Sequence, residues 1–443
     1  MSDTNKKLYI ETYGCQMNFS DSEIVASILK DEGYEKITDS RQADLILVNT
    51  CSIRDNAEDR VRKRLRELYA LKKKNPHLVI GLLGCMAERL KDKIFEQEKH
   101  LDLIIGPDAY RDLPNLLKQA QTGQKAVNVL LSKEETYSDI KPVYIDSNGV
   151  SAFISIMRGC ENFCSYCVVP YTRGKERSRD VKTIVDEASD LFAKGFREVT
   201  LLGQNVNSYA WQELDTKVDF PDLLQKVAAI NPLLRVRFAT SHPKDISDKL
   251  LHTIAANSNI CKAIHLPVQS GSTRMLKLMN RSYTREWYMD RIAAIRQIIP
   301  DCSLSTDIIA GFCGETEEDH RETLSVMKEV GYASAFMFKY SERPNTRAAK
   351  TMTDDVAEEV KTNRLEEIIA LQQQLSLESN KKDIGKIFEV LVEGTSKRSA
   401  EQLFGRTSQN KVVVFPKQQY APGDYVQVKI ISCTPATLKG ELV

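Results

Sequence analysis

The chain has 443 residues, with 62 Lys and Arg against 61 Asp and Glu, and 42% of its residues are hydrophobic. This length exceeds one ordinary core and predicts two or three domains of a globular protein. The near-zero net charge excludes a polycation, so any nucleic-acid partner must be held by local basic patches. Because the stretch MSDTNKKLYIETYG lacks the apolar run of a signal peptide, and no run of about 18 apolar residues follows, we expect a cytoplasmic protein without a membrane span.

The first section of the chain, from Lys7 to about Gln121, alternates short apolar runs with helix-compatible stretches. The runs are LYIETYG, ADLILVNT, LVIGLLG and LDLIIGP. Each predicts a buried strand, and their alternation with helices is typical of a doubly wound parallel sheet. We therefore expect an α/β domain over residues 6–122.

Three cysteines, Cys15, Cys51 and Cys85, each follow the end of one of these expected strands by one to three residues. The carboxyl ends of parallel strands share one edge of a sheet, so the three thiols are expected to converge although 36 and 34 residues separate them. Buried, unreactive thiols are the alternative for any single one. Three in the same position after a strand favour ligation of a metal or cluster.

The second section contains six further strand-like runs, with helix-compatible stretches between them. The runs are SAFISIMRG, EVTLLGQN, RVRFATS, AIHLPVQ, SLSTDIIAG and ASAFMFKYS. Six β/α units predict a partial (β/α)6 barrel over residues 146–377, with its chemistry at the carboxyl ends of the strands. Residues 379–443 consist of short alternating strands broken by Gly, Asn and Pro, which predict a small all-β barrel.

The stretch MRGCENFCSYCVVPYTRGKERSR (Met157–Arg179) places Cys160, Cys164 and Cys167 within eight residues. A structural zinc site needs four ligands, and the nearest candidates, His242 and Cys261, form no second pair of the usual kind. A [4Fe-4S] cluster, by contrast, can leave one iron without a protein ligand. The C-x3-C-x2-C spacing with one open iron resembles the radical S-adenosylmethionine superfamily.

The whole layout resembles the methylthiotransferase family of that superfamily: a flavodoxin-like domain with three cysteines, the radical motif, and a β-barrel similar to the TRAM module. Within the family, NTCSIRDNAEDRV and RGCENFCSYCVVPYTRGKERSR are most similar to the bacterial enzymes that modify dimethylallyladenosine in tRNA. This resemblance implies insertion of a methylthio group at C2 of N6-(dimethylallyl)adenosine beside the anticodon. It also implies two [4Fe-4S] clusters, S-adenosylmethionine, the anticodon stem-loop as partner, and an external electron donor. We expect a monomer.

The resemblance further implies which residues contact the cofactor in the barrel. Gly203, Gln204 and Asn205 end the second strand, Ser241 and Gln269 end the third and fourth, and Tyr166 lies between the last two cysteines of the motif. The alternative for each is plain packing or a turn.

Basic side chains are the candidate RNA contacts. Arg173, Arg177 and Arg179 directly follow the radical motif, and arginine makes bidentate phosphate contacts and stacks on bases. The candidates on the expected β-barrel are Lys397, Arg398 and Arg406. A solvated loop is the alternative.

Three functions remain open on the sequence. The first is radical methylthiolation of dimethylallyladenosine in tRNA. The second is the same chemistry on threonylcarbamoyladenosine of tRNA or on an aspartate of a ribosomal protein. The third, from another class, is a non-catalytic RNA-binding protein with structural metal.

Overall fold

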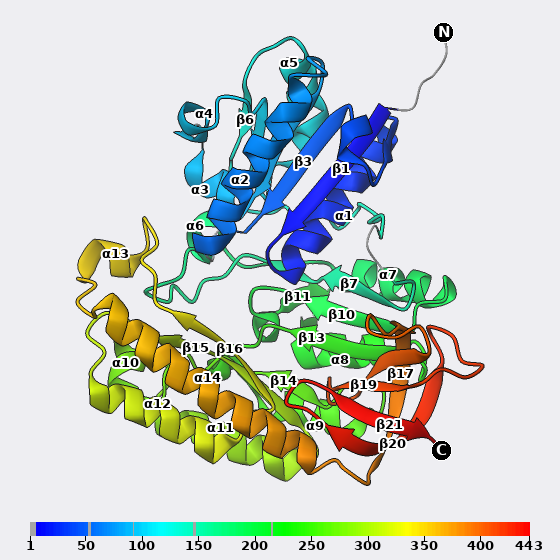
Figure 1. The fold of residues 1–443 in the computed structure, drawn as a ribbon, viewed down its shortest axis with the longest axis vertical. Helices are drawn as coiled ribbons and strands as arrows, with labels where there is room; N and C mark the ends of the chain where they lie inside the picture. Colours follow the sequence, from blue (N-terminus) through cyan, green and yellow to red (C-terminus); the bar gives the residue numbers. More distant parts are fainter. Residues whose placement is uncertain (1–5, 52–54, 92, 145–147, 214–215) are drawn as a thin grey trace. The chain divides into compact units, whose positions relative to one another are not determined.

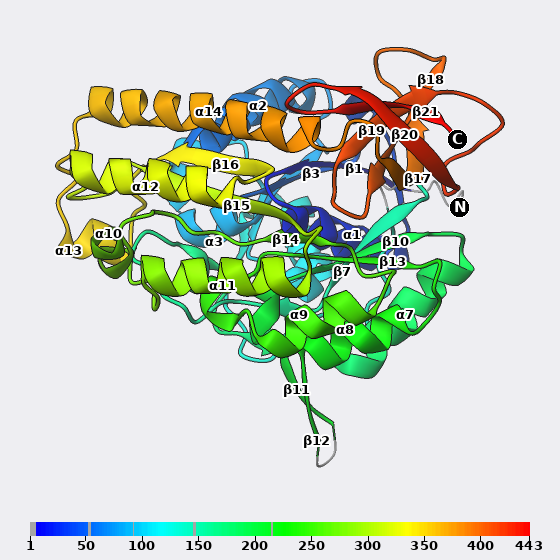
Figure 2. The same cartoon turned by 90° about the horizontal axis from the view of Figure 1, so that it is seen from below.

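The computed structural model describes residues 6–51, 55–91, 93–144, 148–213 and 216–443, and Figures 1 and 2 show its ribbon in two views. The chain divides into two compact units. The first contains residues 1–145, 157–163 and 167–179, and the second contains residues 146–156, 164–166 and 180–443. Among the described residues, no helix is both long and apolar enough to cross a membrane.

A six-stranded parallel sheet forms the centre of the first unit, in the order β2-β1-β3-β4-β5-β6. Its strands are β1 (Lys6–Tyr13), β2 (Tyr34–Lys36), β3 (Leu45–Thr50), β4 (Val79–Gly84), β5 (Leu103–Ile105) and β6 (Ala126–Asn128). The first five follow the flavodoxin-like order, which confirms the expected fold class. Strands β2 and β6, with sequences YEK and AVN, contain no apolar run that would predict them, unlike the equally short β5, and β6 lies beyond the expected boundary at residue 122.

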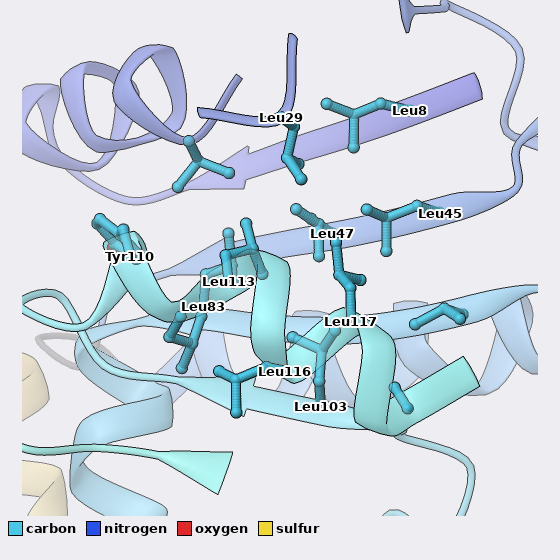
Figure 3. Packing of buried hydrophobic residues seen from close by; sticks show 14 of the residues in the cluster. Leu8, Leu29, Leu45, Leu47, Leu83, Leu103, Tyr110, Leu113, Leu116 and Leu117 are labelled. Carbon is cyan, nitrogen blue, oxygen red and sulfur yellow. The ribbon is translucent and has the colours of Figure 1, made fainter. Parts of the chain in front are cut away.

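Helices cover both faces of this sheet because successive strand residues point to opposite sides. Leu45 and Leu47 pack with α1 (Gln16–Asp31) and α5 (Leu113–Gln121), and Figure 3 shows this cluster. Ile46 and Val48 pack on the other face, which carries α2 (Asp55–Lys72), α3 (Cys85–Leu90) and α4 (Lys93–Gln97). The two-sided core explains why the strands read as continuous apolar runs.

A short hairpin from the radical-motif segment completes the first unit. Strand β8 (Met157–Arg158) pairs antiparallel with β9 (Arg177–Ser178), and α6 (Val169–Thr172) lies between them in the chain. The pairing places Arg158 opposite Arg177. The hairpin thereby brings the residues that precede Cys160 beside those that follow Cys167.

Six parallel strands of the second unit occur where the sequence predicts them. They are β7 (Ser151–Ser155), β10 (Glu198–Leu202), β13 (Arg235–Ala239), β14 (Ala263–His265), β15 (Ser303–Ala310) and β16 (Ser334–Lys339). They form two three-stranded sheets, β13-β10-β7 and β14-β15-β16, and a bridge between Val236 and Ile260 lies where the chain passes from one sheet to the other.

Helices follow the strands, as expected for a partial barrel. They are α7 (Val181–Ala193), α8 (Phe220–Ala228), α9 (Asp248–Ala256), α10 (Thr273–Leu278), α11 (Arg285–Ile298) and α12 (Glu317–Val330). Figure 2 shows the hairpin of β11 (Ala210–Glu213) and β12 (Thr216–Asp219) projecting from this unit. The expected (β/α)6 architecture is confirmed.

The C-terminal part begins with α13 (Arg347–Thr351) and α14 (Glu358–Lys381), and α14 packs against α12 and β16. Helix α14 runs through the expected boundary at residues 377–379, because its apolar face belongs to the barrel while its end reaches the next module. The module is a closed five-stranded barrel of β17 (Ile387–Thr395), β18 (Gln402–Thr407), β19 (Val412–Pro416), β20 (Tyr425–Cys433) and β21 (Leu438–Leu442), which confirms the expected β-barrel.

Hydrogen bonds from strand β13 hold the β-barrel against the (β/α)6 barrel. Arg235 donates from Nη1 to the carbonyl of Arg406 over 2.7 Å, and Arg237 donates from Nη2 to the carbonyl of Thr407 over 2.8 Å. The Arg237 guanidinium is also paired with the buried carboxylate of Glu198 at 2.8 Å. Charged donors at fixed positions orient the module, since such bonds are shorter and stronger than neutral ones.

Candidate active site with two cysteine sets

Strand register brings the first set of cysteines to one edge of the N-terminal sheet. Tyr13 is paired with Thr50, and Thr50 with Gly84. Cys15, Cys51 and Cys85 follow these three residues at the carboxyl ends of β1, β3 and β4. The 36- and 34-residue separations in the sequence thus bring the three thiols to neighbouring strand ends.

The thiols of this set influence one another. Cys15 is exposed, whereas Cys51 and Cys85 are buried. A hydrogen bond from the Cys51 thiol, together with the positive charge of Arg173, lowers the pKa of Cys15 to about 6 against the opposing effect of the packing around its thiol. Burial raises the pKa of Cys85 although Arg173 acts in the opposite direction. A thiolate at neutral pH is the form that binds iron.

Buried amides fix the loops that carry this set. Asn18 donates from Nδ2 to Oδ1 of Asn49 over 3.1 Å, and Asn49 donates from Nδ2 to the carbonyl of Asn18 over 2.8 Å. Gly14 adopts φ +134°, and a Cβ there would lie 2.5 Å from Cβ of Cys51, so no larger residue fits before Cys15. The sequence reasoning missed Asn18 and Asn49; glycine directly before Cys15, Cys85 and Cys160 was the signal available for these tight turns.

Each cysteine of the second set receives a hydrogen bond at its sulfur. Asn162 donates to Cys160 over 3.3 Å, and the backbone N–H of Val169 donates to Cys167 over 3.5 Å, both within the first unit. Within the second unit, Arg281 donates from Nη1 to Cys164 over 3.3 Å. Cys85 likewise accepts from Nε of Arg173 over 3.2 Å.

These donors fit an anionic sulfur group. Hydrogen bonds to ligating sulfur stabilise negative charge on thiolates and on iron–sulfur clusters. Within the described part of the chain, no three His, Cys, Asp or Glu side chains lie closely enough to hold a single metal ion. The argument that these cysteines fit iron–sulfur clusters therefore rests on their chemistry. There are two sets of three thiols, and four of the six sulfurs accept a hydrogen bond from an N–H group.

The barrel strand ends carry buried polar atoms that have no partner among the described residues. They include Oε1 of Gln204, Oδ1 of Asn205 and Oγ of Ser241, all on residues singled out from the sequence. A hydrogen bond from Nδ2 of Asn205 to the carboxylate of Asp245, over 2.7 Å, fixes the Asn205 side chain. Buried polar atoms normally have partners, so these fit a polar ligand such as the amino acid part of S-adenosylmethionine. Asn207, which the sequence reasoning missed, likewise has a buried Nδ2 and a buried Oδ1 without a hydrogen-bond partner among the described residues.

The other cofactor candidates are held by the barrel backbone. Gly203 is buried directly after β10. Gln269 adopts φ +69° and bridges to β15: its backbone N–H donates to the carbonyl of Asp307, and its carbonyl accepts from the backbone N–H of Ile309. The ring of Tyr166 packs edge-on against Phe312, with centroids 6.3 Å apart. Their contacts with the cofactor stay predictions.

The arginines that follow the motif are buried, so the alternative of a solvated loop does not hold for them, and their contacts with RNA stay predictions. Arg173 is 3% exposed and pairs with Asp21 at 2.7 Å, and Arg177 is 6% exposed and pairs with Asp108 at 2.8 Å. Their guanidinium groups are thus bonded to carboxylates. Arg179 is also buried, at 6% exposure.

The candidates on the β-barrel differ among themselves. Lys397 and Arg398 are exposed in the turn between β17 and β18. Arg406 is only partly available, because its Nε lies 3.4 Å from the buried carboxylate of Glu393 and its carbonyl accepts from Arg235. The turn therefore offers the freer positive charges for phosphates.

Comparison with known proteins agrees with this architecture. Three family models match: the Uncharacterized protein family UPF0004 over residues 7–106, the Radical SAM superfamily over residues 154–327, and the TRAM domain over residues 381–443. Fold and site together define an enzyme of the radical S-adenosylmethionine class, which takes S-adenosylmethionine and a [4Fe-4S] cluster.

Curated relatives narrow the family. The tRNA-2-methylthio-N(6)-dimethylallyladenosine synthase of Bacteroides fragilis is 59% identical over 443 residues, covering 100% of this chain and 97% of the relative. That of Phocaeicola vulgatus is 60% identical over 440 residues, covering 99% and 96%. The chain belongs to the tRNA-2-methylthio-N(6)-dimethylallyladenosine synthase family.

Solved structures share the fold at low sequence identity. The radical S-adenosylmethionine methyltransferase TsrM from Kitasatospora setae aligns with a TM-score of 0.58 and 15% identity, over 78% of this chain and 75% of that chain. Its likeness supports the fold alone.

Proposed function

We propose that this enzyme replaces the hydrogen at C2 of N6-(dimethylallyl)adenosine, beside the anticodon of tRNA, with a methylthio group. The observation that carries the proposal is 59% identity over the full length to curated synthases of this name. The two cysteine sets support it, because the reaction needs both a radical and a source of sulfur. An aromatic C–H bond is unactivated, so acid–base groups alone would not functionalise it.

The six cysteines divide between two [4Fe-4S] clusters in this proposal. Cys160, Cys164 and Cys167 hold the radical cluster, and Cys15, Cys51 and Cys85 hold an auxiliary cluster. When bound, these groups and S-adenosylmethionine supply the electron, the radical and the sulfur that the side chains cannot. We refer to the two sets below as the radical set and the auxiliary set.

Side chains of the barrel bind and orient the cofactor. The orphaned oxygens of Gln204, Asn205 and Ser241 accept hydrogen bonds from its polar groups, and Nδ2 of Asn207 donates one. Placing these contacts on strand ends limits their motion, which matters because a misplacement of about 1 Å at a reacting atom costs on the order of 100-fold in rate.

The anticodon arm is bound through its phosphates. Lys397 and Arg398, exposed on the β-barrel, neutralise these phosphates. Arg173 and Arg177 are buried, and their guanidinium groups are paired with carboxylates of the protein. The near-zero net charge agrees with a local contact surface. We place the enzyme in the cytoplasm as a monomer that draws electrons from an external donor.

Nucleoside analysis of tRNA tests the function. The chain is expressed in a host that makes dimethylallyladenosine but lacks its own methylthiolation activity, with Cys164→Ala as the inactive control. We expect the 2-methylthio derivative of dimethylallyladenosine by mass spectrometry with the native chain and none with the control. If threonylcarbamoyladenosine or a ribosomal-protein aspartate were methylthiolated instead, the proposed substrate would be wrong but the proposed reaction would stand. No methylthio product of any kind would favour a non-catalytic RNA-binding protein.

A further inference from the structure

Arg173 contacts the auxiliary set directly although it lies six residues after the last cysteine of the radical set. Its Nε donates to Sγ of Cys85 over 3.2 Å, and its Nη2 donates to Oδ2 of Asp21 over 2.7 Å. The side chain is 3% exposed. All of these residues belong to the first unit.

Asp21 fixes the orientation of Arg173. The carboxylate is fully buried, and its other oxygen accepts from Nη1 of Arg158 over 2.9 Å. Arg158 stands opposite Arg177 in the β8–β9 hairpin, and Arg177 pairs with Asp108 at 2.8 Å. Both oxygens of Asp21 are thus engaged, which leaves Arg173 little freedom to turn away from Cys85.

Positive charge exceeds negative charge in this buried network. Three guanidinium groups, those of Arg158, Arg173 and Arg177, face two carboxylates, those of Asp21 and Asp108, so the difference is one positive charge. Glu88 also lies within electrostatic reach of Asp108, but burial raises the pKa of its carboxyl group to about 7. A buried excess cation is costly unless an anion compensates it.

One donor of Arg173 is unused. Its Nη1 is buried and has no hydrogen-bond partner among the described residues. The other two nitrogens of the same group bind sulfur and carboxylate, so the unpaired one belongs to a guanidinium already aligned with the cysteine site. Nε of Arg158 and Nε of Arg177 also lack hydrogen-bond partners among the described residues, but of these three arginines Arg173 is the one bonded to a cysteine sulfur, so its orphaned donor is the one placed for an anion at the cysteine site.

We propose that Arg173 is a positioning residue for the auxiliary cluster. It orients Cys85 through Nε and compensates the negative charge of the cluster with its guanidinium, whose Nη1 is the donor left for the anionic sulfur of that group. The inference rests on the proposed function, since it requires a cluster on Cys15, Cys51 and Cys85. A cation bonded to ligating sulfur stabilises the reduced, more negative state, so Arg173 raises the reduction potential of this cluster.

The competing explanation is that Arg173 acts only as a structural tether, which means that it holds its segment on the N-terminal sheet. Its loss would then lower stability without changing the electronic properties of the cluster. Arg177 offers the matched control, because it lies in the same segment and pairs with a buried aspartate, while its bonds within the described chain go to oxygen atoms. A tether predicts similar consequences for both arginines.

The experiment uses the full chain with Cys160, Cys164 and Cys167 changed to Ala, so that only the auxiliary cluster remains after anaerobic reconstitution. Arg173→Gln, Arg173→Lys and Arg177→Lys are added singly to this parent. Iron content is measured first, and the midpoint potential is then determined by titration followed by electron paramagnetic resonance. The Lys variants cover the case in which the Gln variant does not fold.

We expect Arg173→Gln to move the midpoint to more negative potential by at least a tenfold change in the redox equilibrium, which is about 59 mV for one electron. Arg173→Lys keeps the charge but loses the Nε hydrogen bond, so it should give a smaller shift in the same direction and altered g values. Arg177→Lys should leave potential and spectrum unchanged. Unchanged potential in both Arg173 variants with full iron, or equal shifts in the Arg173 and Arg177 variants, would overturn the inference. A parent without iron would overturn the two-cluster function before any arginine is changed.

Discussion

Arg281 donates a hydrogen bond from Nη1 to Sγ of Cys164 over 3.3 Å, from a position 117 residues further along the chain. The other contacts of the buried guanidinium are the carbonyl of Pro267 at 2.8 Å and the hydroxyl of Tyr283 at 2.9 Å. Among the described residues, no carboxylate forms an ion pair with it. Its hydrogen-bond acceptors in this part of the chain are thus the Cys164 sulfur, a hydroxyl and a carbonyl.

Loss of that sulfur should leave one donor of the buried guanidinium without its partner. We expect Cys164→Ala to lower the free energy of unfolding by about 1–3 kcal/mol, the usual cost of a buried hydrogen-bonding group left unsatisfied. Cys167→Ala is the matched control, because it also disrupts the radical set but its sulfur accepts from a backbone N–H rather than from a charged group. Adding Arg281→Met to Cys164→Ala should recover most of the difference in denaturant titrations. Equal destabilisation in the two cysteine variants would contradict this role of Arg281.

Iron content should follow the division of the cysteines. Anaerobically reconstituted native protein is expected to hold two [4Fe-4S] clusters, and changing Cys160, Cys164 and Cys167 to Ala should halve its iron. Changing Cys15, Cys51 and Cys85 to Ala should also halve it and abolish methylthiolation, while reductive cleavage of S-adenosylmethionine stays measurable. Full iron in either triple variant would refute the two-site assignment.

RNA binding should depend on salt through the exposed turn of the β-barrel. Lys397→Ala with Arg398→Ala is expected to weaken binding of an anticodon stem-loop and to reduce the slope of log affinity against log salt by roughly 0.7–0.9 for each phosphate that the variant no longer neutralises. Turnover at saturating RNA should change little. Lys182→Ala, which removes an exposed lysine from a helix of the (β/α)6 barrel, is the control. An unchanged slope would exclude the turn as a phosphate-binding surface.

Stability of the first unit should depend on pH through Glu88. Burial raises the pKa of this carboxyl from 4.5 to about 7, with Asp108 adding to the rise. The folded state therefore keeps a proton that the unfolded state releases between pH 4.5 and 7, so this contribution is present below pH 4.5 and is lost as pH rises through 7. Relative to the native protein, Glu88→Gln should gain stability steadily from about pH 5 to about pH 8.

Metal-free protein unfolded by urea at each pH provides the measurement for Glu88. The control is Glu134→Gln, which removes an exposed carboxyl from the same unit. A flat difference for Glu88→Gln would show that its carboxyl is ionised throughout this range.

Gly159 should tolerate no side chain. Its φ is +80°, and an added Cβ would clash with the carbonyl oxygen of Lys175 across the β8–β9 hairpin. Gly123→Ala is the control, because Gly123 has φ +84° but open space around its Cβ. The control should cost about 1 kcal/mol from backbone strain alone. Gly159→Ala should cost more in thermal denaturation and also lose iron from the radical set, whereas equal effects would argue against close packing in the hairpin.

The strands and the cysteines that follow them could be predicted from local patterns in the chain. Apolar runs such as those of β3 and β4 are long enough to show a pattern, and Cys51 and Cys85 directly follow them. The shared edge of a parallel sheet then predicts convergence without any knowledge of side-chain contacts. Strands β2 and β6 were not predicted because YEK and AVN contain polar residues and lie in no apolar run, whereas the equally short β5 lies in the run LDLIIGP.

The roles of the arginines in the radical motif became clear only from the folded arrangement. The sequence predicted Arg173 and Arg177 only as candidate RNA contacts, because their partners, Asp21 and Asp108, lie 152 and 69 residues away in the chain. The same holds for Arg281 and Cys164, 117 residues apart. Burial of a charge becomes favourable only where folding supplies its counter-charge and hydrogen bonds at fixed positions, and local sequence patterns carry no information on such distant pairs.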